Sequence, residues 1–184
     1  DHNGSRGLGD VYKRQHFTEK PLKPSWTLYL GRIEPRKRQY LYQDIYGVEF
    51  VGKYTDTTSF DRNRDCYLGQ WEHEYKLQHV TDYGNMMLLS DGENGTPLVI
   101  KEALVAGLGV VVSKYAAHDL DTSLPFVTVI PDDKWEDIEY VQMKLIENRK
   151  ISVTMRKEIR QYGVDNFSWQ KLVKTYVENI EGME

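Results

Sequence analysis

The sequence is short of cysteine, of positive charge and of long hydrophobic runs, and each shortage excludes a class of protein. Its 184 residues include one cysteine, Cys66, so an internal disulfide and a cysteine zinc site are excluded. With 24 Lys and Arg against 28 Asp and Glu, the net charge is −4, without the basic excess typical of nucleic-acid binding. We therefore predict no nucleic-acid partner, and we expect a reducing, cytoplasmic setting.

No apolar run approaches the roughly 20 residues that a membrane-spanning helix needs. The longest apolar region, residues 98–112, is interrupted by Lys101, Glu102 and two glycines. The sequence begins with neither an initiator Met nor a secretory signal pattern. We expect a protein without a transmembrane segment, and the 40% share of hydrophobic residues suffices for the core of one domain.

The first fifteen residues are polar and rich in glycine, and they have no helical or strand period. Residues 10–15, DVYKRQ, resemble the translation of a transposon-type library adapter left at the end of a metagenomic read. A native flexible linker is the alternative interpretation. Both exclude residues 1–15 from the fold, so we expect one domain at 16–184. On the adapter interpretation, the part of the protein that precedes residue 16 is missing.

From residue 26 onward, strand-length apolar runs alternate with helical patterns. Thr96 is the predicted N-cap of one helix, Pro97 its first residue and Gly107 its stop. Because the apolar runs do not alternate with polar residues, we predict strands buried on both faces. The fold class is α/β, doubly wound, with a mostly parallel Rossmann-like sheet and helices on both faces. The expected strands are 26–30, 48–54, 67–69, 86–89, 110–112 and 126–130, and the expected helices are 37–43, 72–82, 97–106, 136–148, 151–162 and one after Ser168.

Ligands of an open α/β sheet bind beyond the carboxyl ends of its strands, and two predicted loops there stand out. Loop 31–38 is either a solvated basic turn or an anion site, in which glycine permits a sharp turn and cations hold phosphate. Loop 90–97 contains Gly92 and Gly95 and leads into a helix N-terminus, which attracts anions. Together the loops suggest a diphosphate site. The four cations of the first loop are Arg32, Arg36, Lys37 and Arg38.

Neither loop has the G-x-G-x-x-G or the G-x-x-x-x-G-K-[ST] pattern, which argues against dinucleotide oxidoreductases and nucleoside-triphosphate hydrolases. From about residue 26 to the end, the chain instead resembles the C-terminal half of a group 1, family 4 glycosyltransferase. The resemblance implies one half of a GT-B fold, a domain that binds a nucleotide-sugar donor, and a missing N-terminal domain. The motifs that carry it are Gly31-Arg32-Ile33 with Lys37, Leu88-Leu89-Ser90, residues 95–104, residues 106–111 and Phe167-Ser168-Trp169.

The resemblance also implies roles for individual residues. Arg32 and Lys37 match the cationic pair that holds the donor diphosphate and stabilises the leaving group, without a metal or another cofactor. Glu102 matches the second acid of a paired-glutamate motif and accepts hydrogen bonds from ribose hydroxyls. The first acid position falls on Asn94, with Glu93 one residue earlier, so either residue can fill it. The remaining donor-binding residues implied are Gly31, Gly95, Thr96, Pro97 and Leu98.

The predicted function is retaining transfer of a sugar from a UDP- or GDP-linked donor to an unknown acceptor, with little activity from this chain alone. Peripheral membrane association through the missing half is a further expectation. A non-catalytic nucleotide-binding or interaction domain, and a fragment of a sugar-nucleotide epimerase, are the alternatives. We expect no metal site, because the histidines at 16, 73, 79 and 118 lack ligand spacing, and we interpret Cys66 as a small hydrophobic residue.

Overall fold

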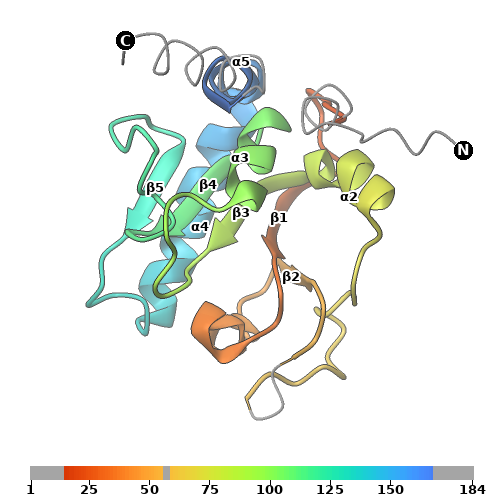
Figure 1. Cartoon of the computed structure of the whole chain (residues 1–184), viewed down its shortest axis with the longest axis vertical. Coiled ribbons are helices and arrows are strands. Elements are labelled where there is room, and N and C mark those ends of the chain that lie inside the picture. The colour runs from red at the N-terminus through yellow and green to blue at the C-terminus, as the bar shows by residue number, and fades with distance from the viewer. Residues whose placement is uncertain (1–14, 56–58, 168–184) are drawn as a thin grey trace, which may run out of the picture.

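The computed structural model describes residues 15–55 and 59–167, and these form an α/β domain built on a five-stranded sheet (Figure 1). All neighbouring strands are parallel, in the order β2-β1-β3-β4-β5. β3 and β4 are buried along their whole length, which explains why their sequences do not alternate. The predicted fold class is confirmed. The strands are β1 (Lys23–Leu30), β2 (Val48–Val51), β3 (Tyr83–Leu88), β4 (Gly109–Ser113) and β5 (Val127–Ile130).

Helices cover both faces of the sheet. α4 packs on one face, against β1, β3, β4 and β5. The crossovers from β2 to β3 and from β3 to β4 run in the same direction, so their right-handed connections place α2 and α3 together on the other face. α5 packs against α3. The helices are α2 (His73–His79), α3 (Leu98–Val105), α4 (Ile138–Thr154) and α5 (Arg156–Phe167), with 3-10 segments η1 (Pro35–Lys37), η2 (Gln39–Tyr42) and η3 (Val80–Asp82).

Several predicted elements were wrong in extent. Tyr67 forms only an isolated bridge to Phe50, and β2 ends at Val51 because Gly52 follows with a φ of +153°. The predicted helix 37–43 is instead η1 and η2, separated by Arg38 in the left-handed region at a φ of +57°. Lacking a Gly or Pro near residue 150, α4 runs on to Thr154 before α5 begins. The helix predicted after Ser168 lies outside the described residues.

The start of α3 also differs from the prediction. Pro97 is the N-cap residue rather than the first helical residue, and no side chain caps the helix. Thr96 lies one residue further out, and its hydroxyl accepts a hydrogen bond from the backbone N–H of Asp119 instead. Gly107, with a φ of +82°, ends the helix as predicted.

A buried arginine ties the segment before β1 to the helical layer. The Arg156 side chain donates to the backbone carbonyls of Thr18, Thr81 and Tyr83, and the residue is only 2% exposed. Burial lowers its pKa to about 10, because desolvation disfavours the charge. Among residues 15–55 and 59–167, no helix is long and apolar enough to cross a membrane.

Candidate functional site

The sheet changes winding direction between β1 and β3. The chain leaves β1 toward β2 on one side and leaves β3 toward β4 on the other, which makes this gap the topological switch point. β1 and β3 are paired, with Leu28 opposite Met86 and Tyr29 opposite Met87, so their carboxyl ends lie side by side. The loops that follow them, residues 31–38 and 89–97, therefore meet at the place where such sheets bind ligands. We call these two loops the loop pair.

The loop pair is held together by bonds between its two members. The backbone N–H of Asp91 donates to the Arg36 carbonyl at 3.0 Å, and Nη1 of Arg36 donates to the Gly92 carbonyl at 3.4 Å. Nζ of Lys37 bonds to Oε1 of Glu93 at 2.9 Å. Two segments more than fifty residues apart in sequence thus form one structural unit, and its geometry is set before any ligand binds.

The ion pair of Lys37 and Glu93 lies well inside this unit. The two side chains are only 12% and 14% exposed. Burial opposes ionisation of Glu93, but the hydrogen bond and charge of Lys37, helped by the charge of Arg36, lower its pKa below the usual 4.5. Glu93 is therefore a carboxylate at neutral pH. The structure brings together one predicted catalytic residue and one of the two candidates for the first acid.

The other cations of the first loop are held differently. Arg38 is fixed against the protein, with its guanidinium 4.0 Å from the centroid of the Trp135 ring and its side chain 15% exposed. Arg32 is 63% exposed, and its nearest carboxylate, Glu34, is 3.9 Å away. Its guanidinium is thus accessible to a ligand. The loop pair holds four cations against the carboxylates of Glu34, Asp91 and Glu93, so its net charge favours an anion.

The second loop is anchored from a third segment. The Thr96 N–H donates to Oδ2 of Asp119 at 3.2 Å, and the Asp119 N–H donates to Oγ1 of Thr96 at 3.0 Å. A hydrogen bond from His118 is the main cause of the lowered pKa of Asp119, with Thr96 and Lys101 adding to it. The Thr96 amide, predicted to approach phosphate or sugar, is therefore occupied. Sequence reasoning missed Asp119, which lies 23 positions away on the loop after β4.

The remaining predicted residues of this loop lie at the mouth of α3. Gly95 has a φ of +91°, a conformation that side chains rarely adopt, and Asn94 is exposed. Leu98, 46% exposed, begins α3. Within the described part of the chain, no acceptor bonds to the backbone N–H of Leu98 or Val99. These two groups are available to an anion.

Glu102 lies apart from the ion pair of the loop pair. It is 2% exposed, and both of its carboxylate oxygens accept hydrogen bonds from Nζ of Lys76 on α2, each at 2.9 Å. No side chain of the loop pair bonds to it among the residues that the structure describes. Its role toward ribose stays a prediction.

Two supporting residues were missed by the sequence analysis. The Tyr29 hydroxyl lies beneath the loop pair and bonds to the backbone of both loops. A Cβ on Gly52 would lie 1.9 Å from the Gly31 carbonyl oxygen, so only glycine allows this approach. Gly31 itself does not have a positive φ, so the sharp turn expected there is not the reason for that glycine. A tyrosine within a buried strand was the available signal, because its hydroxyl needs partners.

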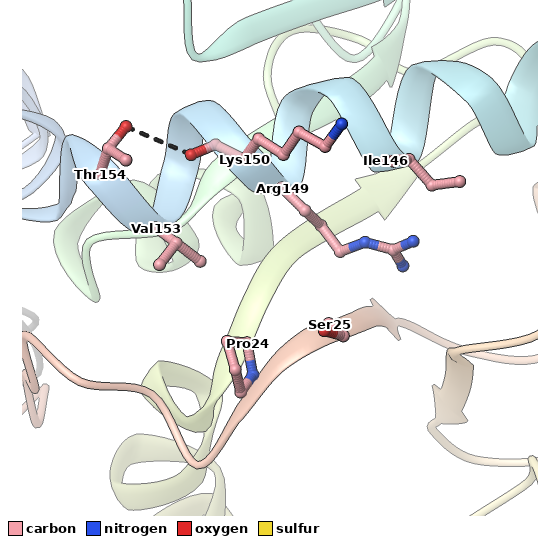
Figure 2. Close-up of a pocket in the computed structure, with 7 residues that line it drawn as sticks. All are labelled: Pro24, Ser25, Ile146, Arg149, Lys150, Val153 and Thr154. Carbon is pink, nitrogen blue, oxygen red and sulfur yellow. Dashed lines mark hydrogen bonds between the residues drawn. The ribbon is translucent and has the colours of Figure 1, made fainter.

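A pocket of about 400 Å³ lies at the opposite end of β1, between the start of that strand and α4 (Figure 2). Arg149 extends into it and donates to Oγ1 of Thr27 at 3.0 Å and to the Gly47 carbonyl at 3.4 Å. Pro24 in the pocket and Leu30 below the loop pair are six strand residues apart, about 20 Å. The pocket is therefore separate from the loop pair, and none of the predicted site residues lines it.

Side chains that ligate metals do not gather in the described part of the chain. Residues 15–55 and 59–167 contain no group of three or more His, Cys, Asp or Glu side chains that could hold one. Cys66 is partly buried, and its thiol pKa is raised, mainly by desolvation, so it is poorly suited to be a nucleophile.

No family model and no curated protein sequence matches this chain. Solved structures are similar to it in fold. HepE from Anabaena, in complex with UDP, is 14% identical with a TM-score of 0.67, over 96% of this chain and 53% of that one. AviGT4, a glycosyltransferase involved in avilamycin A biosynthesis, is 17% identical with a TM-score of 0.64, over 91% of this chain and 53% of its own.

Sucrose-phosphate synthase from Thermosynechococcus elongatus is similar in the same way, 16% identical with a TM-score of 0.61, over 96% of this chain and 49% of that one. The chain spans about half the length of these structures. At such low identity the similarity establishes the fold. The domain has the fold of one half of a GT-B glycosyltransferase, consistent with the C-terminal half.

Proposed function

We propose that this chain is the donor-binding half of a retaining, metal-independent glycosyltransferase, which moves a sugar from a UDP- or GDP-linked donor to an acceptor. The observation that carries the proposal is the loop pair. It places accessible and paired cations beside a helix N-terminus at the switch point of the sheet. The similarity in fold to HepE, whose structures contain UDP or UDP-glucose, supports the nucleotide-sugar part.

In the proposed reaction, the bond between the anomeric carbon and the donor phosphate oxygen breaks, and its electron pair passes to that oxygen. The acceptor oxygen forms the new bond to the anomeric carbon, and its hydroxyl proton is released. The added negative charge on the leaving diphosphate is the charge that Arg32 and Lys37 stabilise. Because Lys37 is held in place by Glu93, little reorganisation is needed when that charge develops.

Glu93, rather than Asn94, fills the first acid position in this proposal. Its Oε1 bonds to Lys37, which leaves Oε2 as an acceptor for a hydroxyl of the donor sugar. The free N–H groups of Leu98 and Val99 face the phosphate end of the donor. The role of Glu102 toward the ribose hydroxyls is proposed from the family resemblance alone, since Glu102 is 2% exposed and both of its oxygens bond to Lys76 in the ligand-free chain.

In this proposal the other half of the GT-B enzyme binds the acceptor. We therefore expect this chain alone to bind the donor but to transfer little sugar. Calorimetric titration with UDP, UDP-glucose, GDP and GDP-mannose tests the proposal. We expect saturable binding of one of the two nucleotides, weakened by Arg32→Ala. Arg64→Ala is the matched control, because Arg64 is also an arginine at the surface, partly exposed and bridged to a carboxylate, that of Asp44.

Failure of all four ligands to bind to the folded chain would overturn the proposal. If the domain is joined to an acceptor-binding half and then binds a donor without transferring or hydrolysing its sugar, the non-catalytic alternative holds instead.

A further inference from the structure

Tyr29 is a fully buried tyrosine in β1, flanked in sequence by Leu28 and Leu30. Its ring stacks on Phe50 of the neighbouring β2, with centroids 5.7 Å apart. A phenylalanine would fill this space equally well. The hydroxyl therefore needs an explanation of its own, because burying it without partners is costly.

That hydroxyl bonds to the backbone of both members of the loop pair. It accepts a hydrogen bond from the Leu89 N–H at 3.1 Å, and it donates to the Lys37 carbonyl. Burial raises the pKa of Tyr29 well above its usual value, so the hydroxyl keeps its proton and its donor role. One side chain thus connects loop 31–38 to loop 89–97 from below.

The two bonds fix the two ends of the ion pair above them. The Lys37 carbonyl sets the position of that backbone, from which the side chain runs past Gly31, about 3.5 Å from where a Cβ on that glycine would lie, toward Glu93. The Leu89 N–H sets the start of the loop that carries Glu93 four residues later. The 2.9 Å separation of Lys37 and Glu93 therefore depends on where both loops are held.

We propose that Tyr29 is a positioning residue of the donor site, whose hydroxyl sets the distance between the Lys37 ammonium and the Glu93 carboxylate. The expected effect of the Tyr29 hydroxyl on donor binding rests on the proposed function. The expected effect of the hydroxyl on the ion pair of Lys37 and Glu93 does not rest on that function, since the pair exists in the chain without a ligand. The two can therefore be tested separately.

The test is Tyr29→Phe, which keeps the ring and removes the hydroxyl. The control is Tyr83→Phe. Tyr83 is also a buried tyrosine, but it begins β3, at the end of the sheet away from the loop pair, and its hydroxyl donates to Glu49 of β2. The glutamate carboxyl carbons of the ligand-free protein are titrated by NMR, and the Glu93 signal is assigned by its loss in Glu93→Gln. UDP binding to each variant is measured by calorimetry.

We expect Tyr29→Phe to raise the Glu93 pKa toward its usual value and to weaken UDP binding about fivefold to tenfold, since one positioned contact loosens. Tyr83→Phe should change neither. A Tyr29→p-aminophenylalanine variant, which again has a donor and an acceptor at that place, should restore the Glu93 pKa. If Tyr29→Phe does not fold, Tyr29→p-fluorophenylalanine replaces it as the test, because its fluorine fills the space of the hydroxyl but cannot donate to the Lys37 carbonyl.

An unchanged Glu93 pKa in Tyr29→Phe would overturn the proposal, as would an equal change in both tyrosine variants. If the pKa rises in Tyr29→Phe alone but neither the variants nor the wild-type protein binds UDP, UDP-glucose, GDP or GDP-mannose, the positioning role stands and the proposed function fails.

Discussion

Replacing Lys37 by glutamine should separate the two roles of this lysine, one in stability and one in donor binding. The substitution removes the ammonium 2.9 Å from Glu93 and keeps a side chain of similar length. Glu93, 14% exposed, then has Arg36 at 4.0 Å as its nearest cation. A largely buried carboxylate is left with a weaker and more solvated partner.

The stability cost follows from that geometry. Breaking a fully buried ion pair costs about 3–5 kcal/mol, and exposed pairs contribute about 0–1 kcal/mol. The pair here is partly solvated and Arg36 remains, so we expect a loss of about 1–2 kcal/mol in the free energy of unfolding. A lost charge-assisted contact to the diphosphate is worth about 1.5–3 kcal/mol, or roughly 10- to 150-fold in the UDP dissociation constant.

Urea unfolding and calorimetric titration with UDP measure the two effects. The double variant Lys37→Gln with Glu93→Gln removes the unpaired carboxylate, so we expect it to recover most of the stability while its UDP affinity stays below that of the wild type. If Lys37→Gln loses stability but binds UDP as tightly as the wild type, Lys37 only supports the fold and its assigned role in the reaction is wrong.

Three further predictions concern stability. Gly52→Ala should cost about 3 kcal/mol or more, because its Cβ would meet the Gly31 carbonyl at 1.9 Å, whereas Gly69→Ala, also at positive φ but with nothing within 4 Å, should cost about 1 kcal/mol in urea unfolding. Since the Glu93 pKa is lowered in the fold, ionisation of Glu93 stabilises the fold above pH 4.5, and this stabilisation is lost as the pH falls through the lowered value. The free energy of unfolding, measured with urea at a series of acidic pH values, should therefore fall less steeply with decreasing pH in Glu93→Gln than in the wild type, and equal slopes would refute this. Arg156→Met should lower the free energy of unfolding by about 3 kcal/mol or more, because several buried carbonyls lose their donor.

The sheet and the place of the site follow from sequence because they depend on local patterns. Apolar runs without alternation predict buried parallel strands, and the loops at their carboxyl ends are defined once the strands are. The loops that carry Arg32, Lys37 and Glu93 were predicted in this way, and the resemblance to the glycosyltransferase family singled out these three residues within them. Helix boundaries were less accurate, since α4 passes through Arg149 and Lys150 without any breaker in the sequence.

The residues that hold the site in place could not be predicted, because their partners are distant in sequence. Thr96 looks like a helix cap by local rules, but Asp119 competes for it from another loop. Tyr29 bonds to Leu89, sixty residues later. Such pairs depend on which loops pack against each other in the folded chain, and a single sequence does not show these long-range contacts.

The central claim is that a nucleoside diphosphate binds at the loop pair. An NMR titration of the isotope-labelled chain with UDP and with GDP tests this claim most directly. One of the two should shift backbone amide signals in residues 31–38 and 89–99, including Arg32 and Lys37, and should leave those around Arg149 in the pocket at the other end of β1 unchanged. Shifts confined to that pocket, or no shifts with either nucleotide, would contradict the account.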